Sequence, residues 1–73
     1  MTIPPIEWLD GVTGSRAWSG AFCLLVHFSD GSYTWEILIG EVLIARFVRR
    51  SRSLDAAKLE CERAFQAAVG VKS

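Results

Sequence analysis

Cys23 and His27 are the residues of this 73-residue chain whose types suit metal binding or acid-base catalysis. Thiolate and imidazole are common zinc ligands, but four steps along an extended strand place them about 13 Å apart, too far to share one ion. His27 could act as an acid-base group with Thr34 opposite and Glu36 diagonal on a neighbouring strand. No nucleophile, paired carboxylates or glycine-rich phosphate loop accompanies it. The sequence therefore predicts a surface histidine, with no catalytic residue, no metal and no cofactor.

Four arginines within seven residues form the strongest signal for a binding site. They lead to Ser53, where a helix is predicted to begin with free N–H groups and a positive dipole end that favour an anion. Guanidinium groups pair well with phosphate and carboxylate, so the cluster predicts an anion or nucleic-acid site. The alternative is a solvated linker whose arginines pair with Glu36, Glu60 or Glu62. The predicted site consists of Arg46, Arg49, Arg50, Arg52 and Ser53.

Two tight turns predict the sheet that precedes these arginines. Asp30-Gly31 suits a type I′ hairpin, and Gly40-Glu41 has the Gly-X form of a type II′ turn. Together they predict three antiparallel strands within residues 17–49, with side chains alternating between two faces. The pairs predicted on one apolar face are Phe28–Tyr33, Val26–Trp35, Leu24–Ile37, Phe22–Ile39, Ile39–Val42, Ile37–Ile44, Trp35–Arg46 and Tyr33–Val48.

The second face of the predicted sheet is too apolar for a side that meets water, because a solvated antiparallel face usually carries polar side chains. Cys23, His27, Thr34, Glu36 and Arg49 share this face with several large apolar residues. We therefore predict a partner there, in a homodimer whose stacked sheets form a sandwich. The predicted partner face consists of Leu25, Leu38, Leu43, Ala45 and Phe47.

The C-terminal part of the chain predicts one helix over residues 53–69. Ser53 is a good N-cap, and Gly70 follows the last apolar residues as the expected C′ glycine. Leu59 points away from the apolar stripe and is predicted to be exposed. The stripe itself, at helical spacing, consists of Leu54, Ala57, Cys61, Ala64, Phe65 and Ala68.

The N-terminal segment, residues 1–16, is rich in turn signals. Pro4-Pro5 predicts a loose lead-in over residues 1–5, and residues 6–9 form a candidate edge strand. Asp10-Gly11 and Thr13-Gly14-Ser15 predict a break after it. Trp8, Leu9 and Trp18 are expected to cover the second sheet face or the end of the core, the alternative being an aromatic binding surface.

Length and composition predict a single small domain over residues 1–73. Hydrophobic residues make up 51% of the chain, which favours a folded globule, and eight basic and eight acidic residues cancel. No apolar run approaches the roughly 18 residues of a membrane span, and no signal peptide is expected. Two cysteines without framework spacing predict reduced thiols and a cytoplasmic location. The expected fold class is α+β, a three-stranded meander with one helix on one face and room for a short extra N-terminal strand.

Three sequence resemblances add to this prediction. Arg50-Ser51-Arg52-Ser53 leading into Ala57-Lys58 and Ala64-Phe65 resembles the last part of a double-stranded-RNA-binding domain, where such a loop and helix start hold phosphate. The two lysines that this family places after the serine are Leu54 and Asp55 here. The order of three strands and a helix is also similar to the arm-binding domain of phage-type integrases. The whole chain resembles short uncharacterised β-β-β-α proteins of phages and prophages, which include accessory and anti-defence factors.

Two functions follow as hypotheses. The first is a non-catalytic protein-interaction module, an accessory or inhibitor-like protein of a phage or mobile element, which forms a homodimer through the second sheet face. Its further partner would be a host or phage protein. The alternative is a nucleic-acid-binding module that uses the arginine cluster, for which steep salt dependence is expected. A membrane role is not expected.

Overall fold

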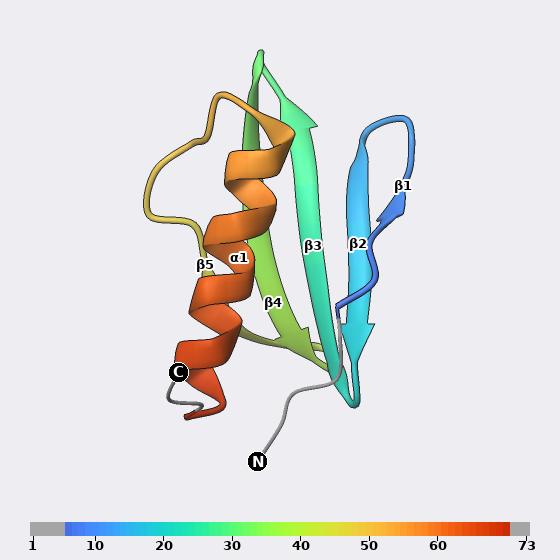
Figure 1. Ribbon diagram of the computed structural model, residues 1–73, viewed down its shortest axis with the longest axis vertical. Coiled ribbons are helices and arrows are strands. Elements are labelled where there is room, and N and C mark those ends of the chain that lie inside the picture. The colour runs from blue at the N-terminus through green and yellow to red at the C-terminus, as the bar shows by residue number, and fades with distance from the viewer. Residues whose placement is uncertain (1–5, 71–73) are drawn as a thin grey trace.

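The computed structural model describes residues 6–70 and has an α+β fold (Figure 1). Within this range the five strands form one antiparallel sheet in the order β1-β2-β3-β4-β5, so each strand pairs with its neighbours in sequence. The lead-in predicted for residues 1–5 lies outside the described residues. The elements are β1 (Leu9–Asp10), β2 (Gly14–Ser19), β3 (Phe22–Ser29), β4 (Ser32–Ile39), β5 (Val42–Arg46) and α1 (Leu54–Ala68).

The prediction of an α+β meander with a C-terminal helix is confirmed, but the sheet is larger than predicted. The sequence indicated three strands and a possible edge strand at residues 6–9; the structure has β2 in addition, and places β1 at Leu9–Asp10. Gly14 and Ser15, interpreted as a break, belong to β2. A Cβ on Gly14 would lie 1.9 Å from the Val26 carbonyl oxygen, so glycine is needed because the β2 and β3 backbones approach closely.

The predicted turn between β3 and β4 is confirmed together with its register. Asp30 and Gly31 have φ angles of 53° and 77°, the two positive values that a type I′ turn requires. All four predicted cross-strand pairs of this hairpin are present, from Phe28–Tyr33 to Phe22–Ile39. Local turn chemistry was therefore sufficient to set this register.

A β-bulge in β5 overturns part of the register predicted beyond the second turn. Ile39 pairs with Val42 as predicted, but the register shifts after Leu38, and Ile37 pairs with Ala45 rather than with Ile44. Glu36 then pairs with Arg46, and Ser51 bridges to Tyr33. The predicted pairs Ile37–Ile44, Trp35–Arg46 and Tyr33–Val48 are therefore wrong. One additional residue in β5 reverses the side on which every later side chain lies.

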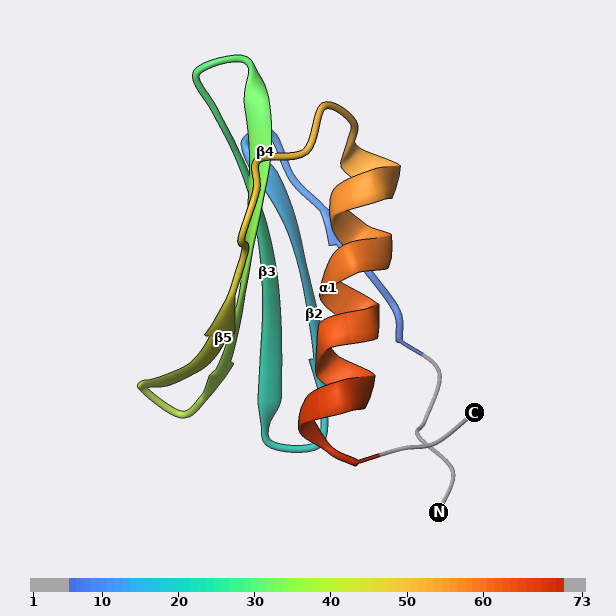
Figure 2. The same cartoon turned by 90° about the vertical axis from the view of Figure 1, so that its left-hand side faces the viewer.

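The helix covers only one face of the sheet (Figure 2). The core between them contains fully buried side chains of β3 and β4, such as Leu24 and Ile37, and Phe65 of α1. The Phe22 and Phe65 rings pack edge to face with centroids 4.9 Å apart. The remaining buried apolar residues of this core are Ala17, Val26, Trp35, Ala57 and Cys61.

The predicted helix ends are confirmed by their capping geometry. Ser53 Oγ accepts a hydrogen bond from the Ala56 backbone N–H at 3.1 Å, which satisfies one of the free amides of the first turn. Gly70 has a φ of 73°, as expected for a glycine that follows a helix. The apolar stripe is confirmed except for Ala68, which is exposed, and Leu59 is exposed as predicted. Among residues 6–70 no helix has the length and hydrophobicity required to cross a membrane.

Candidate interaction surface

The face of the sheet turned away from α1, called the open face below, carries the side chains with the clearest potential for binding. Strand alternation and the observed pairing place these side chains opposite the buried ones. Figure 2 shows α1 against one side of the sheet and no described segment across the other. The open face comprises Leu9, Arg16, Trp18, Cys23, Leu25, His27, Thr34, Glu36, Leu38, Leu43 and Arg46.

Large apolar side chains on the open face meet solvent. Leu9 is 61% exposed, Trp18 50% and Leu43 43%. Leu25 and Leu38 are half-buried between these neighbours. Side chains of this kind on the solvent side of an antiparallel sheet depart from the usual polar pattern. The open face therefore presents exposed apolar side chains of the sort that proteins use for contact with partners.

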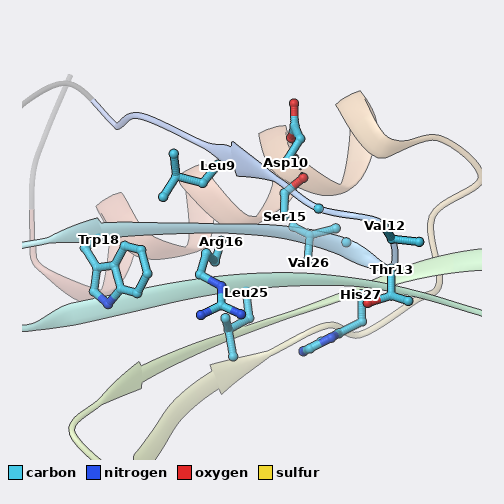
Figure 3. A pocket seen from close by; sticks show the side chains of 12 residues that line it. Leu9, Asp10, Val12, Thr13, Ser15, Arg16, Trp18, Leu25, Val26 and His27 are labelled. Carbon is cyan, nitrogen blue, oxygen red and sulfur yellow. Dashed lines mark hydrogen bonds between the residues drawn. The ribbon is translucent and has the colours of Figure 1, made fainter.

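A groove of about 460 Å³ runs over β1, β2 and β3 at one side of the open face (Figure 3). Leu9, Trp18 and Leu25 supply its apolar walls. Figure 3 shows Arg16 between Trp18 and His27, and the Arg16 guanidinium carbon lies 5.9 Å from the Trp18 ring centroid, within cation–π range. The groove combines a flat aromatic ring with a forked donor, a pairing enriched at protein interfaces.

One row across the open face alternates apolar and charged side chains. Arg16 pairs with Leu25 of β3, Leu25 pairs with Glu36 of β4, and Glu36 pairs with Arg46 of β5. The Glu36 carboxylate lies 3.7 Å from the His27 Nε2, and Arg16 has no ion pair within residues 6–70. Leu25 therefore lies between a basic and an acidic residue, on strands whose backbones are each about 4.8 Å from β3.

The structure brings together three of the five residues predicted for the partner face. Leu25, Leu38 and Leu43 share the open face. Ala45 and Phe47 do not, because the bulge in β5 turns them to the helix side, where they pack against the core. The Phe47 N–H donates to the Trp35 carbonyl at 2.9 Å, which holds this altered register.

Sequence reasoning missed the contribution of β2 to the open face. Arg16 and Trp18 alternate with buried Ser15, Ala17 and Ser19, a period of two that is typical of a half-buried strand. The Gly20-Ala21 turn has the same Gly-X form that identified the second hairpin, and its glycine has a φ of 59°. These two signals together could have predicted β2.

The tryptophans have separate roles. Trp18 lies on the open face, which both predicted alternatives allow, whereas Trp8 packs against the core on the helix side. The Trp8 indole Nε1 donates to Glu62 Oε2 at 2.8 Å, and the Lys58 ammonium lies 5.7 Å from the Trp8 ring centroid. Trp8 therefore leaves the second sheet face uncovered.

The arginines predicted as an anion site make different contacts in the structure. Arg50 Nη1 donates to the Ser29 carbonyl at 3.3 Å and to Ser32 Oγ at 3.2 Å, which ties the loop to the β3–β4 turn. The Arg46 guanidinium lies 5.1 Å from the Phe47 ring centroid. Arg52 is exposed. Arg50 therefore has a structural contact, and Ser53 is the N-cap described above.

Arg49 lines a second cleft, of about 370 Å³, beside α1. Arg63 of the helix lines the same cleft, although sequence reasoning did not connect the two arginines. Glu60, a third lining residue, accepts a hydrogen bond from Ser51 Oγ at 2.5 Å. The cleft therefore contains both signs of charge, with Glu60 held by the buried Ser51.

The two cysteines lie on opposite sides of the sheet. Cys23 is half-buried on the open face, and Cys61 is fully buried under the helix; both thiols are free. Burial raises the pKa of Cys61 to about 12, with smaller contributions from Glu62 and Cys23. Among residues 6–70 no group of three or more His, Cys, Asp or Glu side chains could hold a metal ion.

The chemistry that the open face offers is recognition by apolar contact, cation–π contact and ion pairing. No protein-family model, curated protein or solved structure matches this chain. The resemblances to double-stranded-RNA-binding domains, integrase arm-binding domains and phage proteins therefore stay predictions. The exposure of Leu9, Trp18 and Leu43 is the observation on which a functional proposal can rest.

Proposed function

We propose that this chain is a small non-catalytic protein-interaction module that acts through the open face and forms a homodimer there. The proposal includes the cytoplasmic, accessory or inhibitor-like role that the phage-protein resemblance implies. The single observation that supports it is the exposure of the large apolar side chains Leu9, Trp18 and Leu43 on the open face. Covering such a surface is favourable by about 25 cal/mol for each Å² of apolar area removed from water.

The residue types on the open face suit a protein partner. Tryptophan and arginine are enriched among the residues that dominate binding energy at interfaces, and Trp18 and Arg16 lie side by side in one groove. Leu25 and Leu38 extend the apolar area toward the centre of the sheet. A partner with a flat apolar surface would bury these groups together and exclude water from the groove.

Sedimentation velocity over a range of concentrations tests the proposal. The wild-type chain is expected to dimerise at micromolar concentration, and Trp18→Ser and Leu43→Ser are expected to weaken the dimer. Leu59→Ser is the matched control for Leu43→Ser, because Leu59 is 50% exposed but lies on α1. Equal effects of Leu43→Ser and Leu59→Ser would contradict a role for the open face.

Nucleic-acid binding through the arginines is the competing outcome. Fluorescence anisotropy with labelled single-stranded and duplex RNA and DNA at low salt measures it directly. The proposal expects weak binding that shows no loss in the double variant Arg49→Ala/Arg52→Ala. Tight, salt-dependent binding that this double variant abolishes would replace the interaction module by a nucleic-acid-binding module.

A further inference from the structure

The charges on the open face are arranged so that two copies of this face can complement each other. Arg16, Leu25 and Glu36 are consecutive in one row across β2, β3 and β4. The Arg16 and Glu36 positions therefore lie at similar distances on either side of Leu25, since adjacent strands are about 4.8 Å apart. Rotation by a half-turn about a line along β3 exchanges the two charged positions.

This row can stack on its own copy in two aligned orientations, and the charges favour one of them. Strands of sheets that pack face to face run within about 30° of each other, so a two-fold axis in the interface lies nearly along the strands or nearly across them. An axis across the strands and over this row sets Arg16 against Arg16 and Glu36 against Glu36, which repel. An axis along β3 sets Arg16 against Glu36 of the second copy, twice.

We propose that two copies pack open face to open face about a two-fold axis along β3, with Arg16 of each copy paired to Glu36 of the other. This inference rests on the proposed homodimer and specifies its arrangement. Leu25 lies at the axis against its own copy, between the two reciprocal ion pairs. In the adjacent row, Trp18 lies against Leu38 of the second copy, because these residues pair with Cys23 of β3 from opposite sides.

The size of the open face suits a second copy of the chain. A stable interface of standard size takes about 800 Å² from each partner. The two longer extents of the molecule, 37 and 22 Å, bound a face of that order (Figure 1). Burial of the row would also remove Arg16 and Glu36 from water. Complementary charges across an interface fix its register, and like charges oppose association.

A charge-exchange experiment tests the arrangement. Arg16→Glu places two carboxylates against each other in its homodimer, and Glu36→Arg places two guanidiniums against each other. Each variant alone is expected to dimerise at least about tenfold more weakly than the wild type, measured by sedimentation velocity. Mixed in equal amounts, the two variants are expected to form a heterodimer, because both contacts then join opposite charges. Native mass spectrometry resolves the heterodimer by mass.

Two exposed charges outside the open face provide matched controls. Arg52→Glu and Asp55→Arg change the net charge by the same amounts as the test variants and are expected to leave the dimer unchanged. Circular dichroism establishes that each variant is folded. A wild-type dimer that Arg16→Glu and Glu36→Arg leave intact, or variants whose mixture forms no heterodimer, would overturn the arrangement while the proposed function stands. A monomeric wild type overturns both the arrangement and the homodimer.

Thiol labelling of the wild-type chain gives a second readout that needs no substitution. An axis along β3 buries Cys23 of the two copies inside the interface. Cys61 is fully buried and does not compete for a thiol reagent. N-ethylmaleimide is therefore expected to label Cys23 in dilute, monomeric samples and to react much more slowly with the dimer. A dimer whose Cys23 reacts as fast as that of the monomer contradicts the arrangement.

Discussion

Trp8 and Glu62 are joined by a hydrogen bond of 2.8 Å from the indole Nε1 to the carboxylate Oε2, although they are 54 positions apart in the sequence. The bond attaches the segment that precedes β1 to the outer side of α1. Lys58, one helical turn before Glu62, donates to Asp10 at 2.8 Å and adds a second attachment. The N-terminal segment is therefore held by α1, the last element of the chain.

Trp8→Phe keeps an aromatic ring at this position and removes the donor. We expect the free energy of unfolding to fall by about 2 kcal/mol, the net value of a hydrogen bond to a charged group. Urea denaturation followed by tryptophan fluorescence and circular dichroism measures it. Glu62→Gln keeps an acceptor and is expected to have a smaller effect. Stability unchanged in Trp8→Phe would show that ring packing alone holds the segment.

Asp10 is expected to make folding sensitive to acid. Hydrogen bonds from Lys58 and Ser15 lower the pKa of Asp10 below its ordinary value of 3.8. A lowered pKa in the folded state gives stability that is present above the pKa of the unfolded chain and is lost as the pH falls through the folded pKa. The difference in urea midpoint between the wild type and Asp10→Asn should therefore shrink below about pH 3.8. A difference that stays constant through this range contradicts the assignment.

Gly14→Ala is expected to destabilise the chain severely. Its Cβ would lie 1.9 Å from the Val26 carbonyl oxygen, which is backbone and cannot move aside without separating β2 from β3. We expect a loss of about 3 kcal/mol or more in the free energy of unfolding. Gly11→Ala is the matched control, since its Cβ would meet the Gly14 oxygen at 3.4 Å. Similar unfolding midpoints for the two variants would exclude the close approach.

Deletion of Ile44 is expected to be tolerated. Leu43 already pairs with Leu38 and Ala45 with Ile37, so removal of the residue between them closes the ladder without changing the later pairs. We expect a change of about 1 kcal/mol or less in the free energy of unfolding. Nuclear Overhauser contacts between Phe47 and Trp35 report whether the register is kept. Deletion of Thr34 in the interior strand β4, by contrast, should abolish the cooperative transition.

The features that the sequence predicted correctly are those that a few neighbouring residues determine. Asp30-Gly31 adopts its two positive φ angles because Asp tolerates and Gly permits that backbone, and the β3–β4 register follows. Ser53 and Gly70 mark the helix because capping requires only the residues of the first and last turns. These local conformations do not depend on where the turn or the helix lies in the molecule.

The bulge at β5 and the place of β2 were decided by tertiary packing. The face of the sheet on which Ala45 and Phe47 lie depends on one extra residue in β5, Ile44. Nothing in the local sequence around Ile44 distinguishes a bulge from a regular strand. Gly14 was interpreted as a break because glycine is common in turns, whereas the approach of Val26 requires it within a strand. The contact of Arg50 with the Ser29 carbonyl also depends on residues distant in the sequence. Sequence alone therefore determined the local turns and caps, and only the packing of strands and helix decided which side chains the open face presents.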